Sequence, residues 1–312
     1  MYLSLIIPIY NEAENVRPLC DRIREALAPT GWEYEVVLID DGSTDGSDQM
    51  LAALHHEDAR LKVIRFRRNF GQTAALAAGL AYAKGDIIIS LDGDLQNDPM
   101  DIPLLVAKLN EGYDLVNGWR TNRHDPFLSR RLPSYIANAI ISLATGVKLH
   151  DYGCTLKAFR SEVAKRLKLY GEMHRFIPAL VSDLGGKIAE MPVAHHPRRR
   201  GRSKYGLTRT LWVILDLLTV KFLSDYATRP SHLFGLLGVI AALLGGAITL
   251  LLGLQKILFD VRLANRPLLL LGILLIVLGV QFISMGLIGE MLARTYHESQ
   301  EKPIYVIRDV LE

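Results

Sequence analysis

The sequence predicts an α/β domain with a mostly parallel sheet, followed by two helices that are long enough to span a membrane. Short apolar runs of strand length alternate with segments of helical spacing through the N-terminal third. These runs are continuously apolar, which is typical of parallel strands that are covered on both faces. Two long runs without a charged residue occupy the last third of the chain, and they predict the membrane-spanning helices.

The expected strands and helices alternate along the N-terminal third of the chain. The spacing of Val16, Leu19, Ile23 and Leu27 places four apolar residues on one face of the first helix. The same analysis predicts strands at 3–9, 34–39, 61–66 and 86–91, and helices at 15–28, 47–56 and 72–83.

Four segments follow from the distribution of charge. Residues 1–205 are predicted to form the α/β domain, and 206–229 to form amphipathic helices at the membrane interface. Residues 230–291 are predicted to form a transmembrane hairpin, because no Lys, Arg, Asp or Glu occurs between Arg229 and Lys256 or between Arg266 and Glu290. Residues 292–312 remain as a tail. A helical hairpin buried in protein is the alternative.

Charge and cysteine content place the α/β domain in the cytoplasm. The chain has 36 basic and 33 acidic residues, a net charge of +3, and two cysteines, which do not make a disulfide framework. No basic segment precedes the first strand, so no signal peptide is expected. The basic residues that flank the hairpin favour a multi-pass protein of the inner membrane with domain and tail in the cytoplasm. No nucleic-acid partner is expected.

Three predicted strands end in polar clusters. Tyr10-Asn11-Glu12 follows the first strand, Asp40-Asp41 the second, and Asp92-Gly93-Asp94 the fourth. Ligands of open parallel sheets bind outside the carboxyl ends of the strands, so these clusters are expected to converge on one crevice.

Asp92 and Asp94 are the strongest candidates for metal ligands. Mg²⁺ and Mn²⁺ prefer oxygen ligands and often take one or two carboxylates, with phosphate and water completing the shell. Gln96 can add an amide oxygen, and Gly93 allows a tight turn. A solvated turn is the alternative. The sequence therefore predicts a Mg²⁺ or Mn²⁺ site.

Other candidates for ligand binding have competing structural explanations. Asp41 could hold a ribose or a base, or cap the following helix, for which Asp45 is the better candidate. Tyr10 could stack on a base or pack in the core. The basic stretch 198–204 could close over a diphosphate through Arg202 and Lys204, or bind anionic lipid headgroups. A second set of cations lies near Ser134 and could bind the phosphate of an acceptor: Arg120, Arg130 and Arg131.

Together these residues resemble a known family. The segments 8–12, 40–43, 92–96 and 202–205 are similar to motifs of family 2 glycosyltransferases. They are most similar to the polyprenyl-phosphate glycosyltransferases, which include dolichol-phosphate mannose synthases and bacterial undecaprenyl-phosphate glucosyl- and aminoarabinosyl-transferases. The resemblance covers the whole chain and does not identify the sugar.

The resemblance implies a GT-A fold and an inverting transfer of a sugar from a UDP- or GDP-linked donor to a polyprenyl phosphate. It implies a homo-oligomer, a tetramer in relatives. By the resemblance, the nucleotide contacts are Pro8, Tyr10, Asn11, Glu12, Asp41, Asp92, Arg202 and Lys204. The metal ligands are Asp92, Asp94 and Gln96. The acceptor phosphate is bound by Arg120, Arg130, Arg131, Ser134 and Arg175, and the catalytic residues are Asp94, Asp151 and Arg202.

The charge of the phosphate nucleophile determines the role expected of Asp151. A phosphate nucleophile, with a second pKa near about 6, is already largely ionised at neutral pH, so Asp151 is expected to orient a group rather than act as a strong base. The first rival is another lipid or a polysaccharide as acceptor, and the second is a non-catalytic nucleotide-binding scaffold. A dinucleotide-dependent oxidoreductase is disfavoured because the glycine fingerprint is missing. A chain that ends near Tyr205 is expected to bind nucleotide but to lose activity on long-chain acceptors.

Overall fold

The computed structural model describes eight ranges of the chain: 1–121, 138–139, 141–142, 145–169, 173–197, 230–259, 266–299 and 304–312. The chain forms two compact units. The first comprises Met1–Leu218 with Pro303–Glu312, and the second comprises Thr219–Lys302. The last ten residues therefore belong to the N-terminal unit, although the second unit separates them from it in sequence.

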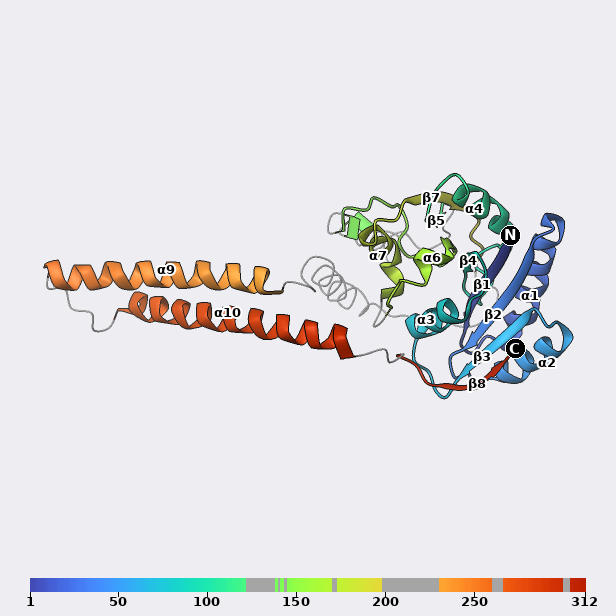
Figure 1. Ribbon diagram of the computed structural model, residues 1–312, viewed down its shortest axis with the longest axis horizontal. Helices are drawn as coiled ribbons and strands as arrows, with labels where there is room; N and C mark the ends of the chain where they lie inside the picture. Colours follow the sequence, from blue (N-terminus) through green and yellow to red (C-terminus); the bar gives the residue numbers. More distant parts are fainter. Residues whose placement is uncertain are drawn as a thin grey trace. The chain divides into compact units, whose positions relative to one another are not determined.

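One sheet organises the first unit. Its strands are β1 (Tyr2–Ile9), β2 (Glu33–Asp40), β3 (Leu61–Phe66), β4 (Ile87–Ser90), β5 (Leu115–Arg120), β6 (Lys157–Arg160), β7 (Ile188–Val193) and β8 (Ile307–Leu311). In the part of the chain that the structure describes, they form an eight-stranded sheet with the order β7-β5-β6-β4-β1-β2-β3-β8 (Figure 1).

The four strands predicted from the sequence form the centre of this sheet and are parallel. β1 pairs with β2 and β4, and β2 pairs with β3. The chain runs from β1 outward to β3 and then returns to the other side of β1 to form β4, so the strand order reverses between β1 and β4. The strand β6 pairs antiparallel with both β4 and β5, and β8 pairs antiparallel with β3. Their pairings were not predicted.

Helices cover both faces of the sheet. In β1, Leu3, Leu5, Ile7 and Ile9 share the hydrophobic core with residues of α1, α2 and α4. Gly79 of α3 lies against Ile6 on the opposite face, where an added Cβ would come within 2.9 Å of the Ile6 Cβ. The described helices of this unit are α1 (Ala13–Leu27), α2 (Ser47–Glu57), α3 (Gln72–Tyr82), α4 (Ile102–Leu109), α6 (Ser161–Ala164) and α7 (Ile177–Asp183), with short 3₁₀ turns at η1 (Ala28–Thr30), η2 (Pro99–Asp101) and η4 (Met173–Arg175).

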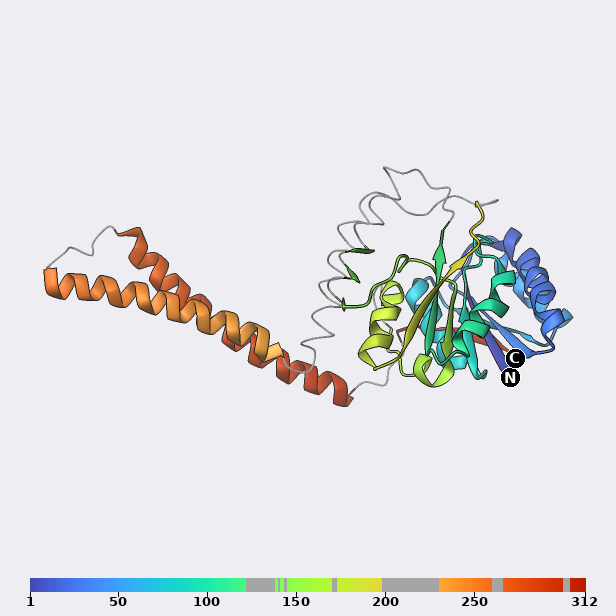
Figure 2. The same cartoon turned by 90° about the horizontal axis from the view of Figure 1, so that it is seen from above.

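The second unit contains two long helices, α9 (Pro230–Phe259) and α10 (Pro267–Ser299). They lie side by side in both views (Figures 1 and 2). Each has an apolar stretch long enough to cross a membrane, Phe234–Phe259 and Pro267–Gly289, and most of each stretch is not buried in protein. Many large apolar side chains on both helices are therefore exposed, as expected for lipid-facing surfaces.

Glycines bring the two helices close together. A Cβ at Gly238 would meet the carbonyl oxygen of Gly279 at 2.6 Å, and one at Gly245 would meet that of Gly272 at 2.5 Å. Small residues at such crossings let backbones approach, which is a common way to pack helices where water does not drive association. The interfacial helices predicted at 206–229 lie outside the described residues.

Candidate active site

The candidate site lies at the carboxyl edge of the sheet, where the strand order reverses between β1 and β4. The predicted metal motif comes directly after β4 and lies against the end of β1. A Cβ added at Gly93 would come within 2.6 Å of the Ile9 Cδ1 and 3.3 Å of the Pro8 carbonyl oxygen. Ligands of open α/β sheets bind at this reversal point, so the fold brings together the predicted clusters that follow the first and fourth strands.

The loop after β1 is tied to the loop after β2. The amide of Asn11 donates to the Ser43 hydroxyl at 2.9 Å, and the Asn11 side-chain oxygen accepts from the Thr44 amide at 2.8 Å. The Glu12 amide donates to the Ser47 hydroxyl at 3.1 Å. Asn11 adopts a left-handed backbone with φ of 54°, which is uncommon for a residue other than glycine. Such strain often marks a functional loop.

Asp41 is buried and organises the segment between β3 and α3. Its carboxylate accepts from the Phe70 amide at 2.6 Å, from the Gly71 amide at 2.9 Å and from the Asn69 side chain at 2.9 Å. Burial raises the pKa of this carboxyl above its ordinary value, although the two backbone hydrogen bonds act in the opposite direction. The predicted contact of Asp41 with a nucleotide stays a prediction, and the partners of its carboxylate in the hydrogen bonds above are all in this segment.

Asp45, and not Asp41, binds backbone amides at the starts of helices, although the N-cap residue of α2 is Gly46. The Asp45 carboxylate accepts from the Ser47 amide at 3.0 Å at the start of α2 and from the Ala13 amide at 3.0 Å at the start of α1. These bonds lower the pKa of the Asp45 carboxyl, against the effect of its burial. Asp45 therefore helps to fix the N-termini of two helices, where backbone amides lack partners within the helix.

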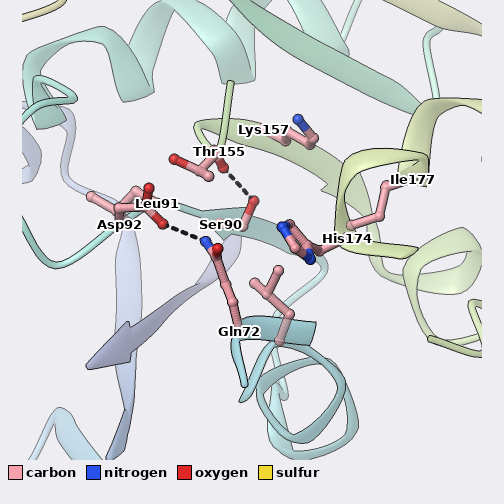
Figure 3. A pocket seen from close by; sticks show the side chains of 9 residues that line it. Gln72, Ser90, Leu91, Asp92, Thr155, Lys157, His174 and Ile177 are labelled. Atoms are coloured by element: carbon pink, nitrogen blue, oxygen red, sulfur yellow. Dashed lines mark hydrogen bonds between the residues drawn. The ribbon is translucent and has the colours of Figure 1, made fainter. Parts of the chain in front are cut away.

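Two carboxylates follow the end of β4, a half-buried Asp92 and a buried Asp94. The Gln72 side chain, from the first turn of α3, donates to Asp92 at 2.8 Å (Figure 3). Asp94 accepts from the Gln96 amide at 3.1 Å, and Leu95 between them is left-handed, with φ of 61°. Burial, and then the negative charge of Asp94, raise the pKa of Asp92 well above its ordinary value.

This donor set fits a divalent cation. Two carboxylates and an amide oxygen are hard ligands of the kind that Mg²⁺ and Mn²⁺ accept. Burial first, and the charge of Asp94 second, disfavour the ionised form of Asp92, and a bound cation would stabilise that form. No cluster of three or more His, Cys, Asp and Glu residues suited to a metal occurs among the residues that the structure describes. Beside two carboxylates and an amide oxygen, water and substrate phosphate would complete the shell of such a cation.

Arg120 and Asp151, which the sequence assigned to separate roles, form one ion pair. The Arg120 Nε and Nη2 atoms donate to the two Asp151 carboxylate oxygens at 2.7 and 2.9 Å. Burial acts to lower the pKa of Arg120, but its hydrogen bonds to Asp151 outweigh this effect and raise the pKa above its ordinary value. The Asp92 charge acts in the same direction.

The loop that carries Asp151 is held from several sides. Glu190 of β7 accepts from the His150 and Asp151 amides, and Asn117 of β5 donates to the Asp151 carbonyl at 2.8 Å. The buried Lys157 ammonium donates to the Cys154 carbonyl. Burial lowers the pKa of Lys157. These contacts fix the loop on β5, β6 and β7.

A small pocket opens beside Asp92 (Figure 3). His174 lines it and contacts the Thr73 hydroxyl of α3 through its Nδ1 atom, at 2.7 Å. Arg175, a predicted acceptor contact, follows His174 in η4. The lining residues are Gln72, Leu76, Ser90, Leu91, Asp92, Thr155, Lys157, His174 and Ile177.

Several predicted site residues lie outside the described part of the chain. They are Arg130, Arg131 and Ser134 of the acceptor set, and Arg202 and Lys204 of the basic stretch. Their roles remain predictions from sequence and resemblance.

The end of β3 carries two site residues that were not predicted from the sequence. Gln72, which binds Asp92, and Asn69, which binds Asp41, both follow this strand. Ligands bind outside the carboxyl ends of parallel strands, and this also applies to β3, because β3 is parallel to β2 and its carboxyl end lies at the same edge. The segment lacks acidic residues, and the site was predicted mainly from carboxylates at strand ends.

Comparison with known proteins agrees with this architecture. Residues 4–168 match the family described as Glycosyl transferase family 2. The chain is 45% identical over 314 residues to a dodecaprenyl-phosphate galacturonate synthase of Rhizobium johnstonii, covering 99% of this chain and 93% of the relative. It is 38% identical over 312 residues to an undecaprenyl-phosphate 4-deoxy-4-formamido-L-arabinose transferase of Edwardsiella ictaluri, covering 99% of this chain and 94% of the relative.

A solved structure supports the fold. Glucosyl-3-phosphoglycerate synthase from Mycobacterium tuberculosis, in complex with Mn²⁺, UDP and phosphoglyceric acid, superposes with a TM-score of 0.55 at 20% identity. The match covers 70% of this chain and 78% of that chain. The α/β unit thus has the GT-A fold that the sequence predicted. The chain belongs to glycosyl transferase family 2.

Proposed function

We propose that this protein transfers a sugar from a nucleotide sugar to a polyprenyl phosphate, with a divalent cation, at the cytoplasmic face of the inner membrane. The observation that carries the proposal is the Asp92–Asp94 pair at the reversal of the strand order. Two apolar helices in the same chain favour a lipid acceptor. The Rhizobium and Edwardsiella relatives, which match over almost the whole chain, are named for prenyl-phosphate acceptors.

In this proposal, Asp92, Asp94 and Gln96 hold Mg²⁺ or Mn²⁺ beside the diphosphate of the donor. The cation would stabilise the negative charge that develops on the departing nucleoside diphosphate. Arg202 and Lys204 are proposed to contact the same diphosphate. Tyr10 and Glu12 of the β1 loop, with Pro8, Asn11 and Asp41, are proposed to form the nucleotide end of the site.

The Arg120–Asp151 pair is proposed to serve the acceptor. A carboxylate that accepts two hydrogen bonds from a guanidinium is a weak base, and a prenyl phosphate needs little deprotonation. Asp151 is therefore proposed to hold Arg120 in position, and Arg120 to bind the acceptor phosphate. The set is proposed to include Arg130, Arg131, Ser134 and Arg175.

The membrane topology is proposed from the course of the chain. The N-terminal unit contains both β1–β7, which precede the two long helices, and β8, which follows them. One sheet cannot be built on two sides of a bilayer, so the chain crosses an even number of times, as two spans do. The basic flanks place this unit in the cytoplasm. A homo-oligomer, a tetramer, is proposed from the resemblance.

A transfer assay tests the proposal. The full-length protein is purified in detergent and incubated with Mg²⁺ or Mn²⁺, undecaprenyl phosphate and a panel of radiolabelled UDP- and GDP-sugars that includes a uronic acid and an aminoarabinose. Label from one donor should enter the organic phase and should be lost with EDTA. A diacylglycerol acceptor runs in parallel. Label on diacylglycerol alone would contradict the acceptor, and absence of nucleotide binding would contradict the donor class.

A further inference from the structure

The last strand of the chain, β8, completes the sheet at the edge formed by β3. It pairs antiparallel with β3, so that Val310 lies opposite Ile64 and Ile307 opposite Phe66 (Figure 1). The Arg67 amide donates to the Val306 carbonyl at 3.1 Å, which continues the pairing beyond the strand. The edge of β3 would otherwise present unpaired backbone groups to solvent.

An aromatic contact extends this pairing toward the candidate site. The Tyr305 ring stacks on the buried Phe66 ring, with centroids 5.1 Å apart and planes 12° from parallel. Phe66 in turn meets Phe70 edge-on at 5.7 Å. Stacked and edge-on pairs of this kind add about 0.5–1.5 kcal/mol beyond the burial of area. Tyr305, two residues before β8, therefore packs on the segment that leaves β3.

That segment, residues 66–72, contacts both carboxylate clusters of the candidate site. The Phe70 and Gly71 amides donate to Asp41, and the Gln72 side chain donates to Asp92. Its backbone also lies directly on Gly42, where a Cβ would come within 2.5 Å of the Arg68 carbonyl carbon. A shift of this segment would therefore move hydrogen-bond donors at both the nucleotide end and the metal end of the site.

We propose that β8 and Tyr305 position segment 66–72 and thereby complete the nucleotide–metal site, so that the end of the chain sets donor affinity. This inference rests on the proposed function. Tyr305 is a positioning residue, because it acts through Phe66 and Phe70 and touches neither Asp41 nor Asp92 in the described contacts. The competing explanation is that β8 only covers an edge and adds stability.

Substitutions at Tyr305 in the full-length protein separate the two explanations. Tyr305→Phe keeps the stacked ring, Tyr305→Leu keeps an apolar side chain without the ring, and Tyr305→Ala removes both. Val306→Ala is the matched control, because the Val306 side chain is half exposed, at 50%, and only its backbone binds β3. Circular dichroism and thermal unfolding show which variants are folded.

Two measurements apply to every folded variant. Hydrogen–deuterium exchange measures the exchange rates of the backbone amides in segment 66–72, and calorimetry measures the affinity for UDP in the presence of Mn²⁺. Tyr305→Leu and Tyr305→Ala should speed exchange in this segment and weaken UDP binding about threefold to tenfold, while Tyr305→Phe and Val306→Ala stay near the parent. Where transfer is measured, the donor KM should rise by the same factor while kcat stays within about twofold.

Unchanged exchange at 66–72 in a folded Tyr305→Leu protein would overturn the inference, as would equal effects of Val306→Ala. A uniform loss of protection across the whole sheet would also overturn it, because that result fits edge cover alone. If the parent binds neither UDP nor GDP with Mn²⁺, the proposed donor class fails, but the exchange measurement still decides whether Tyr305 positions the segment.

The inference changes how a truncation is interpreted. A chain that ends near Tyr205 loses β8 together with the two long helices. Loss of activity in such a chain would then have two causes, the missing membrane helices and the displacement of segment 66–72. Point variants at Tyr305 avoid this ambiguity because they leave the helices intact.

Discussion

An aspartate follows each of the strands β2 and β4, Asp41 buried and Asp92 half-buried, and the two carboxylates have different surroundings. Asp41 accepts two backbone amides and an Asn side chain, all from one segment of its own domain. Asp92 instead faces a second carboxylate, and repulsion from Asp94 adds to the effect of burial on its pKa. Two backbone amides of one loop hold the Asp41 carboxylate, whereas the Asp92 carboxylate, which we propose to bind a cation, accepts from the Gln72 side chain and has a second carboxylate nearby. The comparison predicts opposite responses to substitution at the two positions.

The largest effect is expected from Asp94→Asn. Removing one charged ligand should lower transfer about a thousandfold, because the charge on the leaving diphosphate is no longer balanced. The organic-phase transfer assay measures the loss, and thermal unfolding checks the fold. Asp21→Asn, an exposed change in α1, is the control and should retain parent activity. A folded Asp94→Asn protein with a near-normal rate would refute the metal assignment.

Asp41→Asn should lower the stability of the folded protein. The change replaces an acceptor with a donor amide opposite the Phe70 and Gly71 amides, and a buried donor without a partner costs about 1–3 kcal/mol. The unfolding temperature should fall in the absence of metal and nucleotide. Asp92→Asn should leave it unchanged or raise it under the same conditions, since the change removes a repulsion. If both variants unfold at the same lowered temperature, the two aspartates do not differ as the comparison requires.

Gln72→Ala should loosen the orientation of Asp92 without removing a ligand. Loss of a hydrogen bond to a ligating carboxylate typically weakens metal binding at least about tenfold. The concentration of Mn²⁺ at half-maximal activity should rise by this factor, and activity at saturating Mn²⁺ should approach that of the parent. Gln49→Ala, an exposed change in α2, serves as the control. An unaltered Mn²⁺ requirement would show that the contact is dispensable.

The smallest effect is a pH dependence of stability without metal. Because the pKa of Asp92 is raised in the folded protein, the folded state holds this proton more tightly than the unfolded chain does. The free energy of unfolding should therefore fall as pH rises from about 4 through the raised pKa, and level off above it. Unfolding in EDTA between about pH 5 and about pH 8 should show a shallower decline for Asp92→Asn than for the parent. Parallel curves would argue against the repulsion.

Local sequence patterns predicted the central strands well because each one carries its own signal. Residues 61–66 were expected as a strand and form β3 with the same bounds, and 3–9 fall within β1. The strands β5–β8 carry weaker signals. In β7 most residues are only half-buried, and in β8 no residue is fully buried, so neither forms the continuous apolar run that marks a strand covered on both faces.

The candidate site was predictable in part for a similar reason. Parallel strands place their carboxyl ends at one edge, so Tyr10, Asp41 and Asp92 could be assigned to a common crevice without knowledge of any contact. Which partner each side chain takes was not predictable. Arg120 and Asp151 lie 31 residues apart in sequence, and their pairing depends on how the 150–154 loop packs on β5.

The sequence by itself determined the α/β class, the central parallel strands, the candidate metal carboxylates and the two long apolar helices. These features follow from periodicity, from residue chemistry at strand ends and from length, which are properties of short segments. Only the tertiary structure decided that Asp41 holds segment 69–71, that Asp151 holds Arg120 and that β8 returns to β3. Each of these depends on pairing between segments far apart in the chain, and local patterns do not encode which distant partner packs best.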